Sequence, residues 1–146
     1  MPDPRLQKML TALIQEAPKN GIEASFEDLG DWVKITAQGD SRSQVIVVQA
    51  VPERIGPHGK PHYEAFAAYS PICDVSQLEA LDERVAYVLL ESTYKIGHVR
   101  IADGTVALAH DVYADATPAA FTAVILNLAH SADQLEEMMT NGADDY

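Results

Sequence analysis

The sequence is poor in cysteine, in long apolar stretches and in basic residues, and each scarcity excludes a class of protein. Cys73 is the only cysteine among 146 residues, so the chain cannot form an internal disulfide. This residue follows an apolar, strand-like run, which predicts a buried and unreactive thiol. No apolar stretch is long enough to span a membrane, and the first residues contain no signal-peptide core. We expect one cytoplasmic domain over residues 1–146, without a membrane partner.

Basic residues are scarce relative to acidic ones. The chain has 10 Lys and Arg against 22 Asp and Glu, a formal net charge of −12. Residues 101–146 contain eight acidic residues and no Lys or Arg, which gives −8, and residues 1–100 contribute −4. Because such a surface repels phosphate, nucleic acid is not an expected partner. Solubility is the plain interpretation of the acidity, and an acidic face that meets a basic protein segment is the sharper one.

Common catalytic and metal-binding signatures are also missing. The sequence contains no GxSxG elbow, GxxxxGK(S/T) loop, GxGxxG, HExxH or CxxC. His58 and His62 have HxxxH spacing, but Gly59 and Pro61 exclude a helix there and a third ligand is lacking. We therefore assign no catalytic residue, metal or cofactor, and expect a protein that is not an enzyme.

Carboxylates near the last helix give a second candidate metal site. Asp111 and Asp115 could hold a divalent cation together with Asp133 or Glu136. The segment lacks the central glycine and the graded oxygen ligands of a calcium loop. Asp115 is interpreted instead as helping to cap the helix that starts near Thr117, and Glu136 as part of a solvated helical face.

The segment from His98 to Val112 is predicted to be a β-hairpin. Asp103-Gly104 tolerates the positive φ that a two-residue type I′ turn requires. Pairing outward from the turn aligns Ala102 with Thr105, Ile101 with Val106, Arg100 with Ala107, Val99 with Leu108 and His98 with Ala109. His98 and His110 then leave opposite faces of the sheet, so they cannot share a metal. The apolar face of the hairpin is assigned to the core; its members are Val99, Ile101, Val106, Leu108 and Val112.

The opposite face of this hairpin is built from small side chains. Ala102, Ala107 and Ala109 lie there together with Arg100, and alanines let another backbone or helix approach closely. We expect this small-residue face to contact a partner or a second copy of the chain. The alternatives are that it is simply exposed to solvent or is covered by one of the protein's own helices.

Hydrophobic periodicity predicts the remaining elements. A helix from Asp3 or Pro4 to Ala17 carries an apolar stripe suited to the core or, alternatively, to a partner. Residues 22–26 are either a short edge strand or an extended approach to the sheet. The other expected elements are strands at 32–37, 44–51 and 63–72, a Pro/Gly loop at 55–62, a helix at 76–92 that starts with a Ser76–Glu79 capping box, and a final helix at 118–139 that is capped by Thr117. Together these elements predict an α+β fold with an antiparallel sheet of about five strands, in the order α-β-β-β-α-β-β-α.

This element order, in an acidic chain of this size, resembles the fold shared by type III secretion chaperones and the bacterial YbjN family. The resemblance covers Leu6 to Met139. The residues that carry it are Ser70-Pro71-Ile72, Gly97 before Val99-Arg100-Ile101, the segment from Asp103 to Leu108, and the segment from Ala132 to Glu136. It implies a non-enzymatic homodimer that holds another polypeptide, as a chaperone or a regulatory adaptor. The competing hypothesis is an enzyme or small-ligand-binding protein with a site near His110, Tyr113 and Asp115.

Overall fold

The computed structural model describes residues 4–30, 32–39, 43–55, 61–79 and 98–140. For residues 51–55, 61–64, 78, 79, 102 and 137–140, the description is limited to the backbone. The helices are α1 (Pro4–Glu16), the 3₁₀ turn η1 (Ala17–Asn20), α2 (Val75–Glu79) and α4 (Pro118–Thr140). The strands are β1 (Glu23–Asp28), β2 (Trp32–Gln38), β3 (Ser43–Ile55), β4 (Pro61–Asp74), β5 (His98–Ala102) and β6 (Thr105–Tyr113).

The described strands form one antiparallel sheet of six strands in the order β1-β2-β3-β4-β6-β5. This confirms the predicted α+β class and, in outline, its element order. The sixth strand is β1, which the sequence left open between an edge strand and an extended approach. It pairs with β2 along its whole length, from Glu23 opposite Gln38 to Asp28 opposite Val33.

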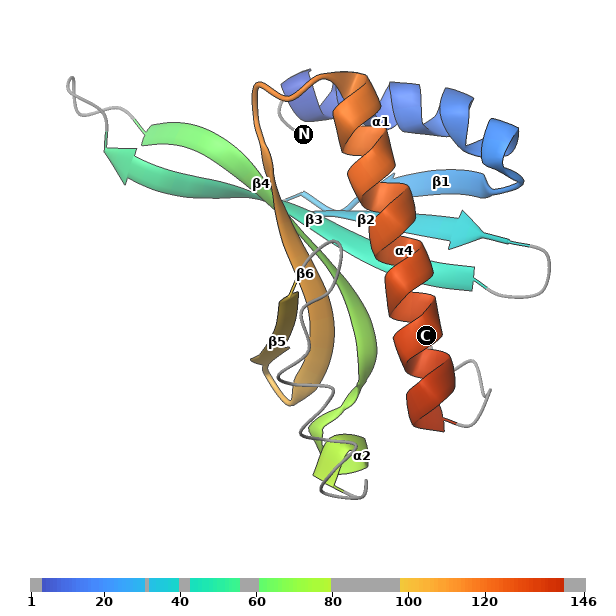
Figure 1. Ribbon diagram of the computed structural model, residues 1–146. Coiled ribbons are helices and arrows are strands. Elements are labelled where there is room, and N and C mark those ends of the chain that lie inside the picture. The colour runs from blue at the N-terminus through green and yellow to red at the C-terminus, as the bar shows by residue number, and fades with distance from the viewer. Residues whose placement is uncertain (1–3, 31, 40–42, 56–60, 80–97, 141–146) are drawn as a thin grey trace.

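Helices α1 and α4 cover the same face of the sheet (Figure 1). The core lies beneath them and is contributed by alternate residues of the central strands and one stripe of each helix. Its largest fully buried side chains include Leu10, Leu13, Ile35, Ile46, Phe66, Ile72, Leu108, Phe121, Ile125 and Leu128. Among the helices whose residues are described, none is both long and apolar enough to cross a membrane.

The hairpin of β3 and β4 is longer than the sequence predicted. Strands were expected over 44–51 and 63–72, whereas the structure continues them to Ile55 and back to Pro61. Cross-strand pairing persists through Pro52, with register shifts on both sides of it. Proline has no N–H to donate, so irregular pairing is how a strand accommodates it.

The outer part of this hairpin extends beyond its neighbours. β2 pairs with β3 from Ser43 to Gln49, and β6 pairs with β4 from Ala65 to Asp74. Residues 51–55 and 61–64 pair mainly with each other, and Figure 1 shows this two-stranded ribbon projecting away from the sheet. We call residues 51–55 and 61–64 the arm.

Helix ends follow the local signals with one exception. The Ala120 N–H donates to Thr117 Oγ1 at 3.1 Å, which confirms the predicted cap of α4. Gly21 stops η1 in the left-handed conformation, with φ 74°. α2 begins at Val75, ahead of the predicted start, and the Asp74 N–H donates to Gln77 Oε1 at 2.8 Å. Gln77 therefore makes the reciprocal bond that the sequence assigned to Glu79. The rest of the predicted 76–92 helix lies outside the described residues.

Candidate functional site

The β5–β6 hairpin has the predicted register throughout. His98 lies opposite Ala109, Arg100 opposite Ala107 and Ala102 opposite Thr105. Asp103 and Gly104 have φ of 51° and 76°, the positive values that a type I′ turn requires. The register could be predicted from the sequence for a simple reason. Two turn residues and the alternation of side chains between the two faces leave one pairing that puts the apolar side chains on a single face.

The small-residue face is largely covered within the chain itself. Ala107 and Ala109 are each 6% exposed, while Arg100 is exposed. The Arg100 guanidinium carbon lies 5.8 Å from the centroid of the Tyr69 ring on β4. Because β6 runs between β5 and β4, the arginine side chain crosses the β6 alanines to reach that ring. The Arg100 side chain thus covers the alanines and makes a cation–π contact within the chain. Arg100 itself is the accessible part of this face. The side chain of Ala102 lies outside the described set.

The three residues of the competing ligand site do not converge. His110 pairs with Ala68 on β4 and shares the face of the buried Leu108 and Val112. Tyr113, three residues further along β6, leaves the other face and is 73% exposed. Asp115 is exposed beyond the strand end.

The acidic residues proposed as cation ligands are also separated. Glu136 lies 18 residues after Pro118 on one straight helix, so it is about 27 Å along the axis from the corner that holds Asp115. Among the described residues, no three His, Cys, Asp or Glu side chains gather closely enough to hold a metal ion. Thr117 fills the cap position of α4, as predicted.

Glu136 is fully buried, so its assignment to a solvated face is wrong. It lies four residues after Ala132 and eight after Leu128, both fully buried, and so continues the core stripe of α4. Its charge, after burial itself and the charge of Asp74, is one of the causes that raise the pKa of the Cys73 thiol to about 11. Glu136 thus lies close enough to the Cys73 thiol for its charge to act there.

Gln44 is the centre of a hydrogen-bonded cluster that joins β3 to β4. It is 3% exposed at the start of β3, and its Nε2 donates to Ser70 Oγ at 2.9 Å and to the Pro71 carbonyl at 3.1 Å. Ser70 Oγ in turn donates to the Val45 carbonyl at 2.6 Å. The Pro71 carbonyl can only accept, and the Ser70 hydrogen is already used, so the amide orientation of Gln44 is fixed. Its Oε1 is buried and has no hydrogen-bond partner among the described residues.

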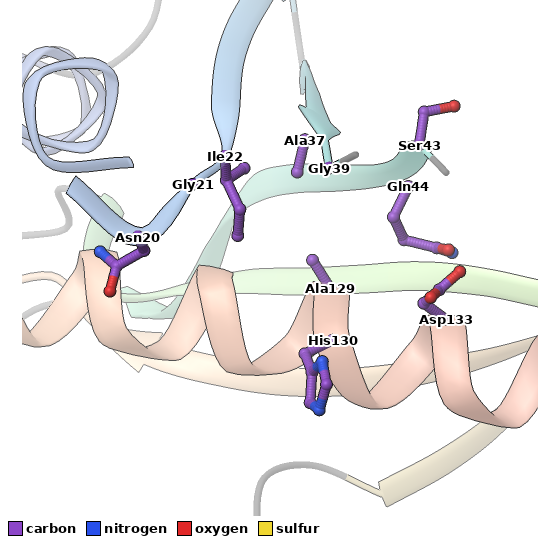
Figure 2. Close-up of a pocket in the computed structure, with 10 residues that line it drawn as sticks. All are labelled: Asn20, Gly21, Ile22, Ala37, Gly39, Ser43, Gln44, Ala129, His130 and Asp133. Carbon is purple, nitrogen blue, oxygen red and sulfur yellow. The ribbon is translucent and has the colours of Figure 1, made fainter. Parts of the chain in front are cut away.

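Gln44 lines a cleft of about 390 Å³ between the sheet and α4. Figure 2 shows the Gln44 amide and the Asp133 carboxylate pointing towards one another at one end of the cleft. Ile22, Ala37 and Ala129 line its apolar part. A second cleft of about 640 Å³ lies between α1 and α4 and shares Asn20, Ile22 and His130 with the first.

The sequence contained a signal for this site. Gln44 shares the parity of Ile46 and Val48 along β3, and both of these are fully buried. A polar residue on a buried face of a strand needs hydrogen-bond partners, which marks it as a candidate site residue. The partners themselves come from β4, at sequence distances that periodicity cannot specify.

No protein-family model matches this chain, and no curated protein matches it. The resemblance to the YbjN family and to type III secretion chaperones stays a prediction that rests on residue patterns and element order.

Proposed function

We propose that this chain is a non-enzymatic protein-binding module that acts as a cytoplasmic homodimer and holds a segment of another polypeptide, as a chaperone or regulatory adaptor. The observation that carries the proposal is the arm. Within the part of the chain that the structure describes, no third strand pairs with the arm. A two-stranded ribbon of this kind is marginally stable in water and presents unpaired backbone N–H and C=O groups along its edges. A second chain that pairs with an edge satisfies those groups and supplies the missing packing.

The two edges of the main sheet are less suited to this role. β1 carries exposed carboxylates at Glu23, Glu27 and Asp28, and charge on an edge strand discourages pairing. β5, at the other edge, is five residues long. Arg100 on β5 is accessible, and we keep the small-residue face as a secondary contact surface in the proposed assembly.

Solution mass tests the dimer. We expect the intact chain to show twice its mass of 15.9 kDa by light scattering at micromolar concentration. Replacing residues 53–62 with Asn-Gly keeps Pro52 opposite Tyr63 but shortens the arm, and should produce a monomer with unchanged far-ultraviolet circular dichroism. Arg100→Ala is the matched control for the small-residue face. It is preferable to Ala107→Arg, because Ala107 is buried and a large side chain there would disturb the fold. A monomeric intact chain would contradict the proposed dimer.

Hydrogen exchange tests the holding of a second polypeptide. Proteins recovered on the immobilised intact chain and on the arm-shortened variant give the candidate partner, which should be lost from the variant. In the purified complex, backbone amides of the arm should exchange more slowly than in the free chain, because strand addition pairs them. Protection confined to other elements would overturn the assignment of the arm as the binding surface.

A further inference from the structure

The cleft beside Gln44 has the size and the chemistry of a small-molecule site. Its volume of about 390 Å³ lies within the range of ligand pockets and is far larger than one water molecule needs. Gln44 lies at its wall, 97% buried, with Oε1 lacking a partner among the described residues. A buried carbonyl oxygen that accepts no hydrogen bond is costly, so this position calls for a donor.

The charge of the residues that line the cleft indicates which kind of hydrogen-bond donor it binds. Asp133 places a carboxylate at the same end as Gln44 Oε1, and the described lining residues include no Lys or Arg. A carboxylate has about four lone-pair sites, so Asp133 can accept from a ligand in addition to the interaction it already makes. Carbonyl and carboxylate oxygens together suit a positively charged N–H donor and disfavour an anion.

The remaining residues that line the cleft indicate the chemistry of the rest of the ligand. Ile22, Ala37 and Ala129 give the cleft an apolar stretch that leads away from the two oxygens. His130 is exposed and points away from Gln44 in Figure 2, so it does not add to the polar end. A divalent metal ion would require more oxygen ligands than this end provides.

We infer that this cleft binds a small aliphatic primary amine, whose ammonium group donates to Gln44 Oε1 and to the Asp133 carboxylate while its hydrocarbon chain contacts Ile22, Ala37 and Ala129. This site is separate from the arm and does not depend on the proposed protein-binding function. No bond is made or broken in it. Ser70 and the Pro71 carbonyl hold the Gln44 amide in its accepting orientation, so a ligand does not have to turn the amide.

A titration with three probes tests the recognition without altering the protein. n-Butylamine, n-butanol and tetramethylammonium are each added to the ¹⁵N-labelled chain at pH 7 and constant ionic strength. We expect saturable shifts of the Gln44 side-chain amide and of the Ala129 backbone amide with n-butylamine, and at least tenfold weaker binding of the other two. Equal binding of n-butanol would overturn the inference, because the cleft would then recognise only hydrocarbon. Equal binding of tetramethylammonium, which has no N–H, would overturn the role of Gln44 Oε1. Failure of all three to saturate would overturn the inference.

Two variants test the residues. Asp133→Asn is nearly isosteric and should raise the dissociation constant for n-butylamine about 10- to 100-fold, since it removes a charged acceptor. Asp115→Asn, an exposed carboxylate outside the cleft, is the matched control and should leave binding within twofold of the intact chain. An Asp133→Asn variant that binds as the intact chain does would overturn the inference. Gln44→Met removes the other acceptor, and the three-probe titration stands even if that variant fails to fold.

Discussion

At the scale of single residues, burial changes the acidity of the Cys73 thiol. It is fully buried on β4, and burial, reinforced by the charges of Asp74 and Glu136, raises its pKa from 9.0 to about 11. The thiolate is the reactive form, so both access and ionisation are suppressed. This agrees with the sequence-based expectation of an inert thiol.

We therefore predict that Cys73 reacts with a disulfide reagent at pH 8 at least a hundredfold more slowly in the folded chain than in 6 M guanidinium, given a pKa raised by about two units. Because the pKa is higher in the folded chain, the thiol ionises at a lower pH in the unfolded chain. The contribution of this thiol to the free energy of unfolding is therefore present below pH 9 and is lost as pH rises towards 11. The Cys73→Ala variant lacks this contribution, and denaturant titrations of both proteins from pH 8 to 10.5 measure it. A folded-state rate within tenfold of the unfolded rate would contradict the prediction.

Glu136 and Gln44 show what could not be predicted for single residues from the sequence. Periodicity places both on buried faces, yet the sequence interpretation of Glu136 followed its charge and not its position on α4. Hydrophobicity predicts burial on average. Whether a polar residue is buried depends instead on the hydrogen-bond partners that other strands provide. For Gln44 those partners are Ser70 and Pro71, 26 and 27 residues away.

At the scale of secondary-structure elements, the start of α4 is set by one side chain. Thr117 Oγ1 accepts the Ala120 N–H, which would otherwise have no helical partner. We predict that Thr117→Ala lowers the free energy of unfolding by about 1 kcal/mol and that Thr117→Ser retains most of it. Urea unfolding followed by circular dichroism measures the change.

Thr11→Ala is the matched control for that cap. Thr11 is exposed within α1, and its hydroxyl donates to the Gln7 carbonyl at 3.0 Å, four residues back. Such a bond contributes little, and alanine is the better helix former, so stability should stay the same or rise by a few tenths of a kcal/mol. An equal loss in both threonine variants would show that the hydroxyl of Thr117 has no special role as a cap.

Element boundaries could be predicted where a local signal decides them. The Asp103-Gly104 turn, the Thr117 cap and the Gly21 stop each act through backbone geometry within a few residues. The arm could not be predicted in this way. The prolines and glycines of residues 55–62 predicted a loop, whereas pairing across the hairpin extends both strands past Pro52 with shifts in register.

At the scale of the whole molecule, the net charge of −12 acts against the compact state. Carboxylates held together on one folded surface repel each other more than in the extended unfolded chain. Among the described residues the exposed acidic groups are distributed over several elements, from Glu16 on α1 and Glu27 on β1 to Asp103 at the β5–β6 turn and Asp115 after β6. The repulsion is therefore spread over distances at which dissolved salt screens it effectively.

We predict that the intact chain becomes more stable as sodium chloride is raised from 10 to 150 mM at pH 7, because the Debye length falls from about 30 Å to about 8 Å. A gain of about 1 kcal/mol would raise Tm by roughly 4 °C in a chain of this length. Thermal unfolding by circular dichroism at a fixed chain concentration measures the shift. Potassium chloride at equal ionic strength should act alike, since screening depends on ionic strength and not on the ion. A Tm that falls with added salt would mean that attractive ion pairs outweigh the repulsion implied by the net charge.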